Sequence, residues 1–114
     1  MTKLTVIEQI LNRPASLTKS GDLVTLKQYI KKELNDIIPL DNLSLEQWAK
    51  VTIAQVNIEF SSITSISKTI TKEQAIDGLE KLNDVGKLVI ELNSYITRML
   101  VDEFKNGGLN KFLK

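Results

Sequence analysis

The sequence predicts an all-α protein, a four-helix bundle in which two shorter N-terminal helices precede a long antiparallel C-terminal helical hairpin. Three observations indicate this fold. Apolar residues recur at helical spacing in four stretches, capping-box patterns stand before several of them, and residues 40–77 contain neither Gly nor Pro. Because only a few residues connect the later helices, consecutive helices are expected to lie antiparallel.

The longest amphipathic stretch runs from residue 71 to residue 106, and we expect it to form one central helix. Its apolar residues cover about half of the circumference, more than the roughly 100° of a surface helix. Such a wide arc predicts packing against more than one neighbour. A capping box at Thr71–Gln74 should begin the helix, and Gly107, in a left-handed conformation, should end it.

Three elements are expected before the hairpin. A short helix is predicted over residues 5–12, and a surface loop over residues 14–21, where Pro, Ser, Thr, Lys and Gly cluster. A second helix is predicted from Ser20 or Asp22 to residue 37 or 38, before Pro39. Its apolar stripe consists of Leu23, Leu26, Ile30, Leu34 and Ile37.

The third helix is expected over residues 45–70, after a capping box at Ser44–Gln47. Residues 51–70 are also rich in β-branched side chains, and residues 56–61 alternate as a strand would. The lack of a turn-forming residue favours the helix, with fraying or a bend near residues 61–67. Residues 109–114 are expected to form one final turn, either docked or as a flexible tail.

The composition is that of an ordinary globular protein. We expect residues 1–114 to form a single helical domain with a core of its own. A net charge of +1 gives no general attraction to nucleic acid or anionic membranes.

No apolar run reaches the about 18 residues that a membrane-spanning helix needs, and no signal-peptide pattern begins the chain. A cytoplasmic protein is therefore expected. Its preference for Ile, Lys and Asn indicates a low-GC bacterium, phage or plasmid as the source.

Enzymatic chemistry is not expected. The chain has no Cys and no His, which removes the usual nucleophiles, bases and metal ligands. The acidic pairs Glu73/Asp77 and Glu80/Asp84 face the polar side of the central helix without His partners, so we expect a solvated surface. Glu59, at the margin of an apolar stripe, is either an acid with a raised pKa or, as we favour, a rim residue or the partner of a lysine. No cofactor or metal is predicted.

The preferred function is protein binding, as an adaptor, assembly chaperone, inhibitor or immunity-type factor. Val51 and Ile58 lie seven residues apart and project opposite the stripe of the third helix, where apolar residues would mark a partner surface. Trp48, the only Trp, is either a core residue, as we favour, or an anchor of that surface.

Three residues on the apolar side of the central helix indicate close packing or self-association, including a homodimer. Gly78 and Gly86 each cost a helix about 1 kcal/mol relative to Ala, so another helix is expected to approach closely there. Asn93 would need a hydrogen-bond partner if buried, and it could set register or oligomeric state.

The alternative function is a nucleic-acid-binding regulator. Lys27, Lys31 and Lys32 form a basic cluster in a helix-loop-helix arrangement over residues 5–38. Acidic residues on the same predicted helix, and the lack of Arg there, favour a solvated surface instead.

Overall fold

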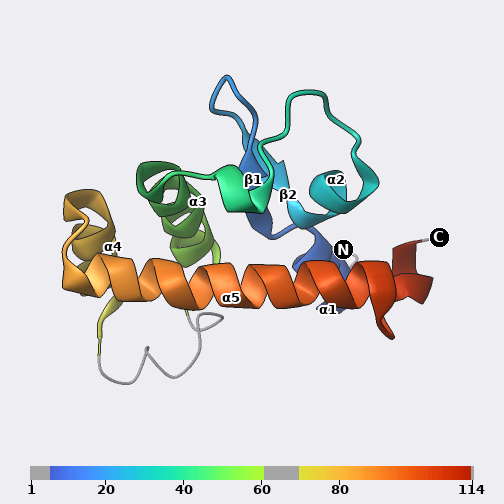
Figure 1. The fold of residues 1–114 in the computed structure, drawn as a ribbon. Coiled ribbons are helices and arrows are strands. Elements are labelled where there is room, and N and C mark those ends of the chain that lie inside the picture. The colour runs from blue at the N-terminus through green and yellow to red at the C-terminus, as the bar shows by residue number, and fades with distance from the viewer. Residues whose placement is uncertain (1–5, 61–69, 114) are drawn as a thin grey trace, which may run out of the picture.

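One long helix, α5 (Asp84–Asn106), runs along the molecule, and several of the other helices pack against it (Figure 1). The computed structural model describes residues 6–60 and 70–113. Within these residues the chain is mostly helical and contains a small two-stranded sheet. The expected all-α four-helix bundle is therefore not confirmed, although the prediction of a mainly helical chain is.

The first helix, α1 (Val6–Leu11), is followed by a β-hairpin instead of a surface loop. Strand β1 (Pro14–Leu17) pairs antiparallel with β2 (Leu23–Thr25), and all four residues of β1 are buried. Buried backbone groups need hydrogen-bond partners, which the neighbouring strand supplies. The predicted loop over residues 14–21 is therefore wrong for the part that forms β1.

The predicted second helix is much shorter than expected. Thr25 begins α2 (Leu26–Lys31) with a complete capping box to Gln28, and Lys32, at φ 54°, ends it in the left-handed conformation. The chain then returns to the sheet, where Ile38 donates its N–H to the Leu17 carbonyl at 2.9 Å. Hydrogen bonds to strand β1 have thus replaced the helical turns that were predicted before and after α2.

The third helix, α3 (Leu45–Ile58), follows a short 3-10 helix, η1 (Leu40–Asn42). Its start at the Ser44 capping box is confirmed. It ends at Ile58, with Glu59 in an extended conformation, well before the expected residue 70. The predicted fraying or bend near residues 61–67 lies outside the described residues.

The expected central helix is two helices, α4 (Lys72–Lys81) and α5. Leu82 is left-handed, at φ 52°, and the Asn83 side chain accepts the Gly86 N–H at 3.0 Å, which caps the new helix. The wide apolar arc therefore belongs to two helices packed on each other. The start after Thr71 and the end at Asn106 are confirmed, but Gly107 has a φ of −108° and is not left-handed.

The C-terminal residues form the expected final turn, η4 (Asn110–Leu113). The Asn110 side chain donates to the Lys105 carbonyl at 2.8 Å, and Leu109 packs beside Phe104 in a small apolar cluster. Leu109 and Asn110 therefore hold the start of this segment against α5, while Phe112 is exposed.

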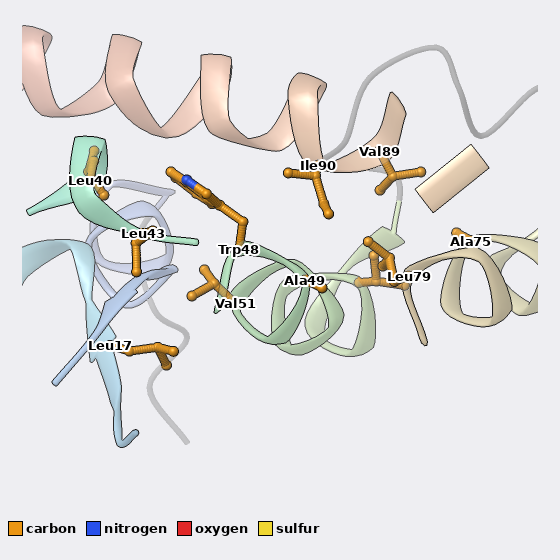
Figure 2. Packing of buried hydrophobic residues seen from close by; sticks show 11 residues of the cluster. Leu17, Leu40, Leu43, Trp48, Ala49, Val51, Ala75, Leu79, Val89 and Ile90 are labelled. Atoms are coloured by element: carbon orange, nitrogen blue, oxygen red, sulfur yellow. The ribbon is translucent and has the colours of Figure 1, made fainter. Parts of the chain in front are cut away.

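The main core lies between α3, α4, α5 and β1, and Figure 2 shows how its side chains meet. Trp48 lies between α3 and α5, while Val51 points toward Leu17 of the hairpin. A second cluster joins α1, β1 and α2 to the end of α5; its buried members are Leu11, Ala15, Leu26, Ile30 and Phe104. Among the described helices, none is long and apolar enough to cross a membrane.

Candidate binding cleft beside Arg13

A buried arginine stands at the junction of α1 and β1. Arg13 is 8% exposed, and its backbone carbonyl accepts the Leu26 N–H at 2.8 Å, which holds it at the start of the hairpin. Its guanidinium Nη2 donates to Asn93 Oδ1 on α5. Burial lowers the pKa of Arg13 to about 10, and the negative charge of Glu59 opposes that shift. The side chain therefore carries its charge at neutral pH inside the protein.

Asn93 links this arginine to α3. It is fully buried, and its Nδ2 donates to the Thr52 hydroxyl at 3.2 Å, which in turn donates to the Trp48 carbonyl at 2.7 Å. A chain of buried hydrogen bonds thus connects Arg13 with Asn93 on α5 and Thr52 on α3. Asn93 has the hydrogen-bond partners that a buried amide requires, and it finds them inside the fold.

Next to Arg13, α1 and the C-terminal end of α3 border a cleft of about 680 Å³. It is larger than the hollow of about 390 Å³ beside Tyr29 and the hollow of about 280 Å³ between α3 and α4. The lining residues come from two segments of the chain: Val6, Gln9, Ile10, Asn12 and Arg13 from the first, and Gln55, Ile58 and Glu59 from the second.

The cleft combines an apolar rim with polar groups. Val6 is 70% exposed and Ile58 is 65% exposed, so both present apolar side chains to solvent. The carboxamides of Gln9, Asn12 and Gln55 each have hydrogen-bond donors and acceptors. The volume falls within the range of about 300–1,000 Å³ that is usual for ligand pockets. Arg13 and Glu59 carry opposite charges, so these two residues give the cleft no net charge.

Among the described residues that line the cleft, none is a Cys, His, Ser or Thr that could act as a nucleophile or as a neutral base. Over residues 6–60 and 70–113, no group of three or more His, Cys, Asp or Glu side chains is placed to hold a metal ion.

Of the predicted partner surface, only Ile58 is exposed. Val51 is fully buried, so the expectation that it faces solvent beside Ile58 is wrong. The reason is that α3 has neighbours on more than one side, with β1 beside Val51 and α5 beside Trp48 and Thr52. Trp48 is 6% exposed and belongs to the same core cluster, as its interpretation as a core residue requires.

Gly78 and Gly86 lie against each other where α4 packs on α5. A Cβ on Gly86 would stand 2.0 Å from the Gly78 carbonyl oxygen, and a Cβ on Gly78 would stand 2.8 Å from the Gly86 nitrogen. Both glycines are buried. Their close approach occurs within the chain, so these positions have no free surface to offer to a second copy.

The three lysines of the basic cluster are exposed, but they do not share one long helix. Lys27, Lys31 and Lys32 are exposed, yet α2 has only six residues and Lys32 lies beyond it in the left-handed conformation. The β-hairpin also stands between α1 and α2, where a surface loop was expected. A role of these lysines in nucleic-acid binding stays a prediction.

Sequence reasoning singled out Glu59 and Ile58 but missed Arg13, which joins them in the cleft. One signal could have found it: Arg13 and Arg98 are the only arginines in a chain rich in Lys. Arg supplies several donors in a fixed geometry and is favoured over Lys in buried positions.

Comparison with known proteins adds no relative, because no family model matches the chain and neither curated proteins nor solved structures give a significant match.

Proposed function

We propose that this chain is a non-enzymatic protein-binding domain that holds a peptide segment of a partner in the cleft between α1 and α3. The observation that carries the proposal is the cleft itself, where exposed Val6 and Ile58 stand beside three carboxamides and a buried arginine. Apolar side chains of a partner would pack on the rim, as anchor residues do in protein interfaces.

The polar residues of the cleft favour a peptide backbone as the bound group. A peptide has an N–H and a C=O at nearly every residue, and Gln9, Asn12 and Gln55 can pair with both kinds of group. The opposite charges of Arg13 and Glu59 cancel, which favours a partner segment that is apolar and uncharged. An adaptor, assembly chaperone, inhibitor or immunity-type factor would use such a site, and the proposal includes action in the cytoplasm of a low-GC bacterium or its phage.

A peptide-display selection on the purified protein tests this function. Peptides that bind wild type are measured by fluorescence polarisation against Ile58→Asp, which places a charge on the apolar rim. We expect affinity to fall by at least about ten-fold, equivalent to about 1.4 kcal/mol. Backbone NMR shifts on titration should cluster at residues 6–13 and 55–59.

The matched control is Leu45→Asp. Leu45 is 42% exposed and lies at the first turn of the same helix, far from the cleft. An Asp there also suits the N-terminal end of the helix, so folding should be preserved. If both variants bind the peptides as wild type does, or if NMR shifts map elsewhere, the cleft is not the binding site.

A further inference from the structure

The long helix α5 carries a second apolar stripe of four residues, of which Leu92 packs against the main core and the other three lie outside the core clusters. Leu88, Leu92, Tyr95 and Met99 follow one another at intervals of four, three and four residues. Leu88, Tyr95 and Met99 are 45%, 69% and 47% exposed, and Leu92 is half-buried. Single exposed apolar residues are common, but a row of them on one helix is a candidate interface.

The three exposed residues of the stripe, Leu88, Tyr95 and Met99, face away from the domain. The buried side of α5 is formed by other residues, namely Gly86, Val89, Ile90, Asn93, Thr97 and Phe104. In Figure 1 the helices α2, α3 and α4 and the β-hairpin lie to one side of α5. Projected at about 100° per residue, Leu88, Tyr95 and Met99 fall nearly opposite the buried side, and Leu92 falls between the two.

The spacing of the stripe is that of a two-helix seam. Intervals of three and four residues place side chains at the a and d positions of a heptad, where they interlock with the same positions of a second helix. From Leu88 to Met99 the seam extends for about 17 Å, at about 1.5 Å per residue. A contact of this length is typical of a weak interface.

A row of charged residues runs beside the stripe and indicates which second helix would fit against it. Asp84, Glu91, Arg98 and Lys105 recur every seven residues along one flank and are all exposed. The N-terminal half of the row is acidic and the C-terminal half is basic. In an antiparallel pair of α5 helices, with Leu92 opposite Tyr95 of the other copy, each acid of the row lies beside a base of the other copy.

A parallel pair would instead bring the two acidic halves to the same end. The helix dipole accounts for an acid in the first turn and a base in the last, but its effect does not reach Glu91 and Arg98 in the middle. Arg98 also pairs with Asp41 of its own chain and lies 6.0 Å from the centre of the Trp48 ring, while Lys105 lies 5.9 Å from the centre of the Tyr29 ring. The Arg98 and Asp41 side chains are 48% and 82% exposed, and ion pairs and ring contacts at such exposed sites are each worth about 1 kcal/mol or less. Arg98 can therefore exchange or share this partner on association.

We propose that a second copy of this chain docks on the stripe, so that two α5 helices pair antiparallel. Glu91 of each copy then meets Arg98 of the other, and Asp84 meets Lys105. This interface uses neither α1 nor α3, so it is independent of the peptide-binding cleft.

Sedimentation equilibrium from micromolar to millimolar protein tests the association. Wild type should pass from monomer to dimer over this range, and Tyr95→Glu should weaken the dimer by at least about ten-fold. The control Leu23→Glu changes a residue that is 46% exposed on β2 and should dimerise as wild type does. A wild type that stays monomeric at millimolar concentration, or a Tyr95→Glu dimer as strong as wild type, would overturn the proposal.

A charge exchange tests the pairing. Glu91→Arg should weaken the dimer, since each new Arg faces Arg98 of the other copy, and the double variant Glu91→Arg/Arg98→Glu should restore it. Thermal unfolding of each variant separates loss of folding from loss of association. A folded double variant that dimerises no better than the single one would overturn the antiparallel arrangement.

Cysteine cross-linking gives an independent readout, because the natural chain has no Cys. Leu88→Cys and Met99→Cys, oxidised separately, should stay unlinked, whereas an equal mixture should form the disulfide between positions 88 and 99. Cross-linking of Leu88→Cys alone would mean a parallel pair and would contradict the proposal. Peptide affinity at the cleft should be unchanged in Tyr95→Glu. This measurement shows whether peptide binding in the cleft and association through α5 succeed or fail independently of each other.

Discussion

Arg13 keeps its charge in a position where little of its side chain meets water. Removing an ion from water is costly unless hydrogen bonds and opposite charges compensate it. Asn93 supplies an acceptor from α5, and Glu59 supplies a negative charge from the end of α3. The arginine therefore ties together three parts of the chain that are far apart in sequence, and the order of the cleft depends on this tie.

Asn93→Ala should lower the free energy of unfolding by about 3 kcal/mol, because the buried guanidinium loses its acceptor and stays charged. Urea unfolding followed by circular dichroism measures this loss. Ser94→Ala is the matched control, since the Ser94 hydroxyl makes only an exposed hydrogen bond to the Glu91 carbonyl. Its effect should stay within about 0.5 kcal/mol. Equal effects of the two substitutions would contradict the role given to Asn93.

At the scale of elements, the junction of α4 and α5 depends on two glycines. Gly78 and Gly86 allow the two helices to approach until backbone contacts backbone. Leu82 turns the chain between the helices in the left-handed conformation, and Asn83 caps the new helix. Glycine within a helix loses about 1 kcal/mol relative to Ala, and the close contact of the helices offsets this loss.

Gly86→Ala should destabilise the protein by about 2 kcal/mol, although Ala is the better helix former, because its Cβ would overlap the Gly78 carbonyl. Gly108→Ala is the control, since a Cβ at that position has no neighbour within 4 Å. Chemical denaturation measures both. A gain in stability for Gly86→Ala would show that the helices are farther apart than described.

At the scale of the whole molecule, α5 serves as a spine with two sides. Its buried side holds the core and the Asn93 network, and its exposed side carries the stripe of Leu88, Tyr95 and Met99. The cleft lies away from this stripe, between α1 and α3. One chain can therefore bind a peptide and a second copy on separate surfaces, as the two proposals require.

The position of the core predicts opposite results for two residues of α3. Val51→Asp places a carboxylate at a fully buried position and should cost about 4 kcal/mol, a large part of the about 5–15 kcal/mol by which a domain is stable. Ile58→Asp, at a largely exposed position, should cost at most about 1 kcal/mol. Thermal unfolding of both variants checks this. Similar melting temperatures would mean that Val51 is not in the core.

Local patterns were sufficient for the helices that begin with a capping box. Ser44 and Thr71 begin α3 and α4 where the sequence predicts, because a cap is a set of hydrogen bonds between residues only three apart. The same pattern at Thr25 and Gln28 marks the start of α2 and could have been recognised. Glu59 and Ile58 also stood out from helical phase alone, and both line the cleft.

Contacts between distant residues decided the rest. No local pattern distinguishes an apolar strand that pairs, such as β1, from a loop, because the partner strand supplies its hydrogen bonds. The periodicity of residues 71–106 does not reveal the break at Leu82, since both helices bury apolar residues against each other. Val51 is buried because β1 covers α3, and Arg13 is held in place by Asn93, eighty residues further along the chain. Packing between segments, rather than their local preference, therefore placed the cleft on the molecule.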